Sequence, residues 1–438
     1  MTRNNLEIPR STCRLFGTIK ALSTVKRSAI LVHGPRGCVY HINYILGMRG
    51  DRPSAIYSTS LDEQDVIFGA EGRLSAAIEE LDRRLSPDLI FVLSCCASSI
   101  IGEDVKSACG AARARARVIG FESGGFEGDH HTAYGDALSR LAGELSRPAG
   151  EPRPGSVNLV GMLRAGPDLR ELKRVLSLAG IEVHAVLSAD ATLRDLEGLG
   201  GAALNVVVCE PAGRAAAEFL EEKFGTPFIV EEFPIGSRAT VSFLERVASA
   251  LGIPFSPGCL AGERAAGACS SPEPGPEQDA SSPGGIPSGL ASSGRRGLSL
   301  RVAVVGGPTR SVSMVRFLRD SGLEPVLVVV DFDAGTREKL AGLAIPGLEI
   351  LIEPSQEEIL SRLSALGVDL IIGGMAERPL AALLGIPHLD MMHGSQKTAC
   401  FAGERELTRL LAGIRAARQG RRGPEGGPEP YSPAPGAG

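Results

Sequence analysis

The amino-acid sequence predicts an α/β protein with mostly parallel sheets, arranged as three Rossmann-like domains. Short apolar runs typical of buried strands alternate with longer segments whose apolar residues recur at helical spacing. This alternation indicates βα units, in which helices join parallel strands. It occurs in three blocks, at residues 1–150, 151–256 and 300–415. A chain of 438 residues is long enough for two or three domains with separate cores.

The composition is that of an ordinary globular protein, with 43% hydrophobic and 22% charged residues. The formal charge of −5 gives no reason to expect nucleic acid as a partner. No apolar run reaches the length of a membrane span, and the N-terminus lacks the apolar region of a signal peptide. We therefore expect a cytoplasmic protein without a membrane partner. Its nine cysteines are then expected to be thiols or metal ligands rather than disulfides.

The first block, residues 1–150, begins with a strand that runs into a Gly-Pro-Arg-Gly-Cys turn. Its strands are predicted at residues 28–32, 55–60, 88–93 and 117–121. Helices are predicted at residues 42–48, at residues 74–85 and from about residue 103. Ser86-Pro87 should end the second of these helices, because proline cannot continue a helix.

The second block, residues 151–256, repeats the pattern and predicts a second Rossmann-like domain. Its strands are predicted at residues 157–161, 182–187, 204–209 and 228–231. Its helices are predicted at residues 169–179, 215–224 and 241–251, and Gly225 should end the second of them.

Residues 257–299 interrupt the pattern. Gly, Ser, Pro and Ala dominate this segment, which cannot bury a core, so a disordered linker is predicted. The third block follows at residues 300–415, with strands predicted at 300–305, 325–330, 348–352 and 369–373. The tail, residues 416–438, is rich in Gly and Pro and is also predicted to be disordered.

Gly306-Gly-Pro-Thr-Arg310 joins the first strand of the third block to a helix. Such a junction presents the amides of a helix N-terminus to an anion. The segment is not GxGxxG, so it is a weak signal for a nucleotide, and a tight turn that requires glycine is the alternative.

Cysteines follow two buried strands of the first block, and this pattern carries the functional hypothesis. Cys38 follows the strand at 28–32, and Cys95 and Cys96 follow the strand at 88–93. The carboxyl ends of parallel strands lie at one edge of a sheet, so these thiols should converge there. We therefore expect Cys13, Cys38 and Cys96 to hold an iron–sulfur cluster.

A four-iron cluster normally takes four ligands, and this argument supplies three. The fourth must come from Cys95, from a group other than cysteine, or from a second subunit. The last alternative predicts a cluster at a subunit interface.

Three motifs together resemble the nitrogenase component 1 family. They are His33-Gly-Pro-Arg-Gly-Cys38, Leu61-Asp-Glu-Gln-Asp-Val-Ile-Phe-Gly69, and Cys96 followed by Ile101-Gly-Glu-Asp104. The resemblance covers nearly the whole chain outside residues 257–299. The family includes nitrogenase alpha and beta subunits, cofactor-assembly scaffolds, protochlorophyllide reductase subunits and the nickel-sirohydrochlorin diamide reductive cyclase.

The resemblance implies three Rossmann-like domains around a central cleft. It assigns Cys13, Cys38 and Cys96 to the three cluster positions, with Cys95 as an extra neighbour. The implied cluster is [4Fe–4S] or P-cluster-like, shared with a homologous subunit in a homodimer or heterotetramer. An ATP-hydrolysing iron protein would supply the electrons. The chain has no GxxxxGK[ST] motif, so we expect ATP hydrolysis on that partner.

The second and third blocks resemble the nitrogenase alpha subunit at two further positions. Cys209 falls where that subunit ligates its iron–molybdenum cofactor, and His393 resembles the histidine ligand. From the residues alone, Cys209 is equally a buried thiol at a strand end, and His393 an ordinary loop histidine. The implied occupant of the cleft is a second metallocofactor or a tetrapyrrole substrate.

The sequence therefore predicts a nitrogenase-like oxidoreductase subunit that relays electrons from an iron protein to a substrate or metallocofactor in the cleft. The alternative is an assembly scaffold without turnover of its own. The branch of the family stays open: the Cys96 segment is closest to the methanogen cyclase, while Cys13-Arg-Leu-Phe-Gly resembles the scaffold and nitrogenase branches. An α/β binding protein without metal is a third reading.

Overall fold

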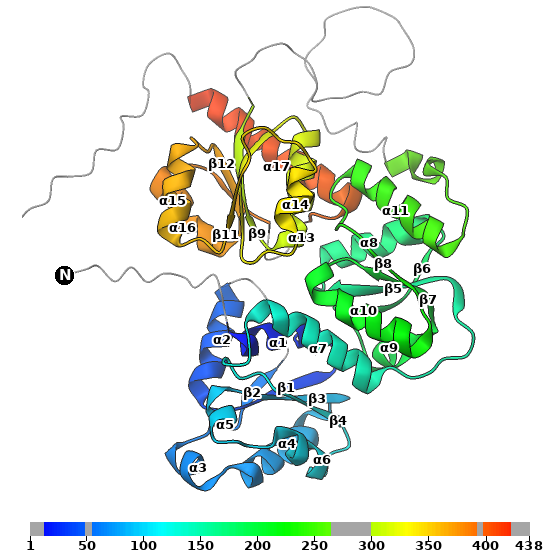
Figure 1. The fold of residues 1–438 in the computed structure, drawn as a ribbon, viewed down its shortest axis with the longest axis vertical. Coiled ribbons are helices and arrows are strands. Elements are labelled where there is room, and N and C mark those ends of the chain that lie inside the picture. The colour runs from blue at the N-terminus through cyan, green and yellow to red at the C-terminus, as the bar shows by residue number, and fades with distance from the viewer. Residues whose placement is uncertain (1–12, 49–54, 264–298, 392–396, 422–438) are drawn as a thin grey trace, which may run out of the picture.

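The computed structural model describes residues 13–48, 55–263, 299–391 and 397–421. These residues form three α/β domains, each built on one sheet (Figure 1). All the strand pairs in the described residues are parallel. The predicted fold class is therefore confirmed. None of the described helices combines the length and the apolar character that a membrane span needs.

The first domain has a four-stranded sheet with the order β2-β1-β3-β4. Its strands are β1 (Ser28–His33), β2 (Ile56–Ser58), β3 (Leu89–Ser94) and β4 (Arg117–Phe121). Its helices are α1 (Arg14–Leu22), α2 (Arg36–Met48), α3 (Glu63–Phe68), α4 (Glu71–Leu85), α5 (Cys96–Ile100), α6 (Val105–Ala111) and α7 (His130–Leu145).

The two central strands of this sheet decide where the cysteines lie. Every residue of β3 is buried, as is typical of a parallel strand covered on both faces. β1 and β3 pair in register from Ser28 with Leu89 to His33 with Ser94. The two strands therefore end side by side, and the segments that follow them leave the sheet from neighbouring points.

The second domain has a four-stranded sheet with the order β6-β5-β7-β8. Its strands are β5 (Arg153–Met162), β6 (Glu182–Ser188), β7 (Ala202–Val207) and β8 (Phe228–Val230). Its helices are α8 (Pro167–Leu178), α9 (Leu193–Glu197), α10 (Glu210–Phe224) and α11 (Ser237–Leu251), with short 3₁₀ helices at Gly198–Gly201 and Pro257–Leu260. α10 ends at Gly225, whose φ of 72° is the left-handed value that favours glycine at a helix end.

The third domain has a five-stranded sheet with the order β11-β10-β9-β12-β13. Its strands are β9 (Arg301–Gly306), β10 (Glu324–Val330), β11 (Glu349–Ile352), β12 (Leu370–Gly373) and β13 (His388–Asp390). Its helices are α13 (Pro308–Asp320), α14 (Thr336–Ala341), α15 (Gln356–Ala365), α16 (Arg378–Leu384) and α17 (Cys400–Arg421), with a 3₁₀ helix at Met375–Glu377.

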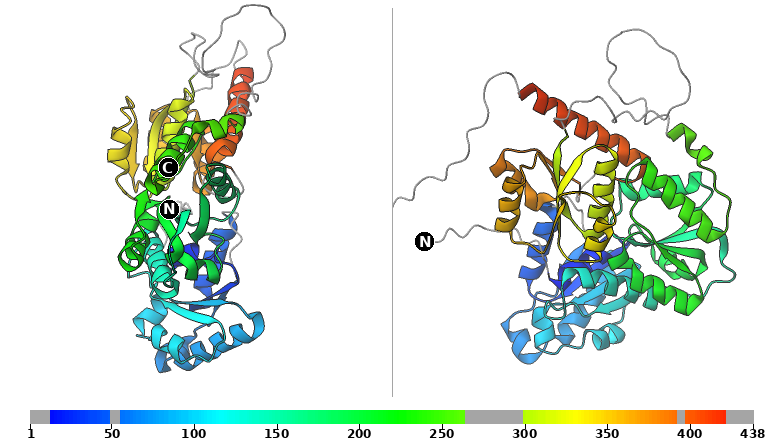
Figure 2. Two further views of the ribbon diagram at one scale, coloured as in Figure 1. Left: turned by 90° about the vertical axis from the view of Figure 1, so that its right-hand side faces the viewer. Right: turned by 45° about the horizontal axis from the view of Figure 1, so that its top comes forward.

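Helices of neighbouring domains pack against each other. α7 of the first domain packs against α10 of the second. α17 leaves the third domain and packs against α8 and α11 of the second, and Figure 2 shows it as the red helix along one side of the molecule. The ring of His131 stacks on Phe332, with centroids 4.0 Å apart, which joins the first and third domains. The three domains therefore form one packed body.

Two stretches of the structure extend beyond the domain boundaries predicted from the sequence. Residues 257–263, at the start of the predicted linker, pack on the second domain: Leu260 is fully buried, and Glu263 pairs with Arg174 and Arg405. α17 extends to Arg421, beyond the predicted domain end at 415. Residues 264–298 and 422–438, most of both segments predicted to be disordered, lie outside the described residues.

Candidate metal centre

Cys38 and Cys96 lie at the carboxyl edge of the first sheet, as the sequence predicted. Both are in the first turns of helices rather than in free turns: Cys38 is in α2, and Cys96 begins α5. Because β1 and β3 end in register, these two helices start from adjacent positions on the sheet edge. Both cysteines are only partly buried, so their sulfurs remain accessible to a ligand.

Cys13 joins this edge from the other side of the domain. It is the exposed residue that precedes α1, and its backbone bridges Asp129 in the segment before α7. The next residue, Arg14, bonds to the carbonyl of Glu122 at 3.2 Å and to Asp136 at 2.6 Å. These contacts hold the start of α1 against the segment that follows β4.

The segment after β4 supplies a backbone donor to the site. The amide of Gly125 donates to Cys96 Sγ at 3.2 Å. A Cβ at Gly125 would lie 3.0 Å from that sulfur and 3.5 Å from Cys13 Cβ. Cys13 and Cys96 are therefore neighbours across one glycine. Two bonds between Ser123 and Ser94, at 2.7 and 2.8 Å, fix this segment to the end of β3.

Cys95, which sequence reasoning left as a neighbour, is a fourth thiol of the group. It is buried beneath Gly34, where a Cβ would lie 2.3 Å from its sulfur. Its thiol shares a hydrogen bond with Cys38, which raises the pKa of Cys38 and lowers that of Cys95. Burial and the nearby sulfurs of Cys95, Cys96 and Cys13 raise the pKa of Cys38 further. The four thiols are thus close enough to influence one another electrostatically.

This donor set fits an iron–sulfur cluster better than a single metal ion. Within the described residues, no three His, Cys, Asp or Glu side chains converge closely enough for one ion. The thiolates that hold a cluster bind different irons, so they need not meet at one point. Partly exposed thiols, a glycine with no room for a side chain and an amide directed at sulfur are the surroundings that such clusters use.

Cys209 lies in a different environment, between the second and third domains. It follows β7 and precedes α10, and its sulfur accepts a hydrogen bond from Thr309 of α13 at 3.6 Å. Burial raises the pKa of the Cys209 thiol, an effect that the Thr309 bond opposes. A cavity of about 300 Å³ opens beside it, and its lining includes Arg214, Lys339 and Thr309.

His393 lies outside the described residues, but the chain on its C-terminal side is firmly placed. Asp168 accepts bonds from the backbone amides of Thr398 and Ala399 at 2.8 and 3.0 Å. Arg310 bonds to the same carboxylate at 2.8 Å. Thr309 and Arg310 are consecutive in α13, so one helix turn contacts both Cys209 and the segment that returns from His393. The Gly-Gly-Pro-Thr-Arg junction thus organises the interdomain site through its side chains.

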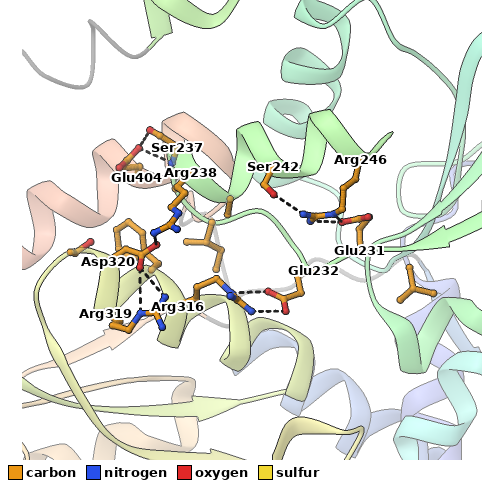
Figure 3. Close-up of a pocket in the computed structure, with 16 residues that line it drawn as sticks. Glu231, Glu232, Ser237, Arg238, Ser242, Arg246, Arg316, Arg319, Asp320 and Glu404 are labelled. Carbon is orange, nitrogen blue, oxygen red and sulfur yellow. Dashed lines mark hydrogen bonds and ion pairs between the residues drawn. The ribbon is translucent and has the colours of Figure 1, made fainter. Parts of the chain in front are cut away.

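A larger cavity of about 530 Å³ lies near this cleft (Figure 3). Four arginines line it, and each pairs with an acidic side chain of the same cavity: Arg316 with Glu232, Arg246 with Glu231, and Arg238 and Arg319 with Asp320. These ion pairs offset the positive charge of the arginines. Among the residues that the structure describes, the cavity therefore lacks the unpaired arginines that an anion-binding site would use.

The sequence predicted Cys13, Cys38, Cys96 and Cys209 as candidate ligands, but not the residues that contact them. Gly125 and Ser123 act through contacts with residues about thirty positions away, which no local pattern reveals. The signal that was available is the Ser-Gly-Gly run after the strand at 117–121, because loops at a strand end carry function.

Comparison with known proteins shows which proteins this chain is similar to. The family model described as nitrogenase component 1 type oxidoreductase matches residues 13–269 and 296–414. The iron-molybdenum cofactor biosynthesis protein NifE of Clostridium pasteurianum is 29% identical, over 92% of this chain and 88% of its own length. The nitrogenase molybdenum-iron protein beta chain of Methanococcus maripaludis is 26% identical, over 86% of each.

A solved structure shares the fold. The structure titled nitrogenase Cp1 at pH 6.5 superposes with a TM-score of 0.80 over 97% of this chain and 96% of its own, at 20% identity. The match spans all three domains and supports the arrangement seen in Figure 1.

Proposed function

Because the chain belongs to the nitrogenase component 1 type oxidoreductases, we propose that it is a cluster-bearing subunit of a nitrogenase-like assembly. Cys13, Cys38 and Cys96 would hold an iron–sulfur cluster, of the [4Fe–4S] or P-cluster type. The observation that carries this proposal is their position on one open sheet edge, with Gly125 donating to the sulfur of Cys96. When bound, such a cluster supplies one-electron transfer.

A homologous subunit is proposed to complete the cluster site, as a second copy or as a different chain. Four large apolar side chains are exposed on the elements that carry or contact the cysteines. They are Tyr40 (74% exposed), Tyr44 (56%), Ile100 (70%) and Phe126 (77%). Exposed apolar groups gathered around partly open thiols are expected where another protein covers the site. A fourth ligand would then come from that partner or from Cys95.

The iron protein is proposed to dock on the same domain at the end of α3. Val66, Ile67 and Phe68 are 46, 72 and 84% exposed there, beside Gly69 and the start of α4. Component 1 proteins of this family work with an ATP-hydrolysing iron protein, and this apolar tip is suited to a transient contact with one.

Electrons delivered to the subunit would serve a metallocofactor or a tetrapyrrole in the cleft beside Cys209. In that role Cys209 is the proposed thiolate ligand, and His393 is the proposed second ligand. Arg214 and Lys339 line the cavity and both pair with Glu210, so their charge is offset within the site. Thr309 donates to the Cys209 sulfur and opposes the rise of its pKa on burial.

Two roles share this architecture: a reductase with turnover and a scaffold on which a metallocofactor is assembled. The sequence favours the first through its resemblance to catalytic branches of the family. The 29% identity with a cofactor biosynthesis protein along nearly the whole chain favours the second.

Turnover separates the two roles. The protein is purified anaerobically and incubated with its iron protein, ATP and dithionite. Sustained consumption of reductant supports the reductase, whereas transfer of a bound metallocluster to an apo-acceptor without sustained consumption supports the scaffold. A protein that takes up neither iron nor electrons after reconstitution would overturn both.

A further inference from the structure

A buried histidine and a buried glutamate face each other beneath the cysteine edge. His33 ends β1 and is fully buried, and the Glu103 side chain is 5% exposed. Nε2 of His33 lies 3.5 Å from Oε2 of Glu103, and neither atom has another hydrogen-bond partner in the described part of the chain. Two buried polar atoms without other partners are costly unless they serve each other.

The other side of the imidazole is fixed by Thr59. Thr59 Oγ1 accepts the amide of Gly34 at 3.1 Å and lies 3.1 Å from Nδ1 of His33. If Nε2 carries the ring proton, His33 donates to Glu103 and accepts the Thr59 hydroxyl at Nδ1. In the other tautomer Thr59 accepts from Nδ1, because a hydroxyl oxygen has two lone pairs. Burial lowers the pKa of His33, against the opposing effect of Glu103, and this favours the neutral ring.

The pair connects the two helices that carry Cys38 and Cys96. Gly34, next to His33, leads into α2, and Leu61 and Ser58 also bond to its carbonyl. On the other side, the amide of Glu103 donates to the Ser98 carbonyl of α5 at 3.1 Å. The His33–Glu103 contact therefore closes a ring that runs through both cysteine-bearing helices.

Glu103 also contacts the segment that joins β2 to α4. Its Oε1 accepts the amide of Ala70, at the start of α4, at 2.5 Å. One carboxyl group thus joins the segments that follow β1, β2 and β3. The surrounding core is packed with Ile, Leu and Val, and an apolar pair of this size would hold the layers together at lower desolvation cost. A polar pair instead has one preferred geometry.

We propose that His33 and Glu103 are positioning residues for the metal centre, whose contact fixes the spacing of Cys38 and Cys96. The inference rests on the proposed function, because it assumes that these cysteines bind a cluster. Neither residue touches the reacting atoms; both act through the helices that carry the thiols. Removing the contact would let α2 and α5 shift against each other, which alters the geometry of the ligands.

The test compares Glu103→Ala, Glu103→Gln and His33→Phe with the full-length protein, and uses Glu80→Ala as the matched control. Glu80 is an exposed residue of α4 in the same domain and pairs with Arg84. Glutamine can keep both contacts of Glu103 if the imidazole takes its other tautomer, whereas alanine removes both. Monodisperse protein is reconstituted with iron and sulfide, and iron affinity, the electron paramagnetic resonance spectrum and the midpoint potential are measured.

Glu103→Ala and His33→Phe should bind iron about 10- to 100-fold more weakly, as for other partners that orient metal ligands. Their residual clusters should show altered spectra and potentials. Glu103→Gln and Glu80→Ala should match the unaltered protein. A folded Glu103→Ala or His33→Phe protein with unchanged affinity, spectrum and potential would overturn the inference.

Loss of folding in both of those variants, while Glu103→Gln folds, would also overturn it, since the pair would then serve folding alone. An unaltered protein that takes up no iron marks a failure of the proposed function. If the unaltered protein binds iron and Glu103→Ala has the same iron affinity, spectrum and midpoint potential, this inference alone fails.

Discussion

The two cysteine regions of the molecule differ in the kind of side chain that surrounds the thiols. At the first sheet edge, Cys13, Cys38 and Cys96 are partly or fully exposed, and apolar side chains surround them. Between the second and third domains, Cys209 is partly buried, as Cys38 and Cys96 are, but the nearby side chains are charged. The first region is an open sheet edge, whereas the second lies beside a cavity at the contact between two domains.

This difference indicates two kinds of occupant. Exposed thiols ringed by apolar groups are suited to a resident cluster that a second protein covers. A partly buried thiol beside a cavity of about 300 Å³ lined by ion pairs is suited to a cargo that arrives and is held by hydrogen bonds.

Replacing a cysteine of the sheet edge should have the largest effect. Cys38→Ala removes one of three proposed ligands, and we expect nearly all cluster iron to be lost. Cys259→Ala is the matched control, because Cys259 is an exposed thiol on the 3₁₀ helix Pro257–Leu260. Iron and acid-labile sulfide are measured after anaerobic purification. A Cys38→Ala protein with full iron content would remove this cysteine from the ligand set.

Placing charge on the apolar surface should separate the subunits. Phe126→Asp puts a carboxylate where we expect a partner, and the resulting desolvation should weaken association by about 2 kcal/mol or more. Sedimentation velocity at several concentrations measures the change. The control is Leu383→Asp, on an equally exposed residue of α16 in the third domain. If both variants associate as the unaltered protein does, the interface lies elsewhere.

The stability of the contact between the second and third domains should depend on the buried carboxylate of Asp168. Asp168→Asn leaves Arg310 without its charged partner, and we expect a loss of about 3 kcal/mol of unfolding free energy at neutral pH. Burial raises the pKa of Asp168, but Arg310 and the Thr398 amide outweigh it and bring the pKa to about 2. Asp190→Asn, at an exposed ion pair with Lys26, is the control and should change little.

The pH dependence of this effect follows from the sign of the shift. Because the folded-state pKa of Asp168 lies below the ordinary value of about 3.9, its contribution is complete above about pH 4 and is lost as the pH falls toward 2. Urea unfolding from about pH 5 downward should show the difference between Asp168→Asn and the unaltered protein shrinking. A difference that is constant with pH would contradict the assignment.

Crowding the glycine between Cys13 and Cys96 should weaken the cluster without unfolding the protein. In Gly125→Ala the new methyl group would lie 3.0 Å from Cys96 Sγ, so we expect a partial loss of iron, by about 3- to 10-fold in affinity. Gly37→Ala is the matched control in the first turn of α2, where a Cβ meets nothing within 4 Å. Equal iron binding in both variants would show that the Gly125 contact is not needed.

The smallest effect is expected on the reactivity of the Cys209 thiol. Thr309→Val removes the hydroxyl that donates to Cys209 Sγ, so the pKa of Cys209 should rise further and its alkylation should slow by a few-fold. Mass spectrometry of iodoacetamide-treated protein over a range of pH measures the rate, and Cys259 serves as the internal control. An unchanged rate at Cys209 would mean that the hydroxyl does not act on the thiol.

Local patterns predicted much of the fold. The strand at 28–32, the helix that stops at Ser86-Pro87 and the helix that ends at Gly225 are all seen, because each depends on residues near in sequence. α7 was not predicted, although its buried face carries Leu138, Leu141 and Leu145 at helical spacing. α17 was also missed.

The positions of the proposed ligands could be predicted from the sequence, whereas the contacts around them could not. Cys38 and Cys96 could be placed because both follow recognisable strands. The contact between His33 and Glu103 spans seventy positions in the chain, and the role of Gly125 depends on its approach to Cys96. Such contacts arise only from tertiary packing, which no single-sequence pattern encodes.

The most direct test of the cluster is its content in the unaltered protein. The full chain is purified without oxygen, and iron, acid-labile sulfide and visible absorbance are measured before and after reconstitution. We predict a brown protein in which iron and sulfide are present in similar amounts and are lost together in Cys38→Ala. A colourless protein that binds no iron even after reconstitution would contradict the central claim.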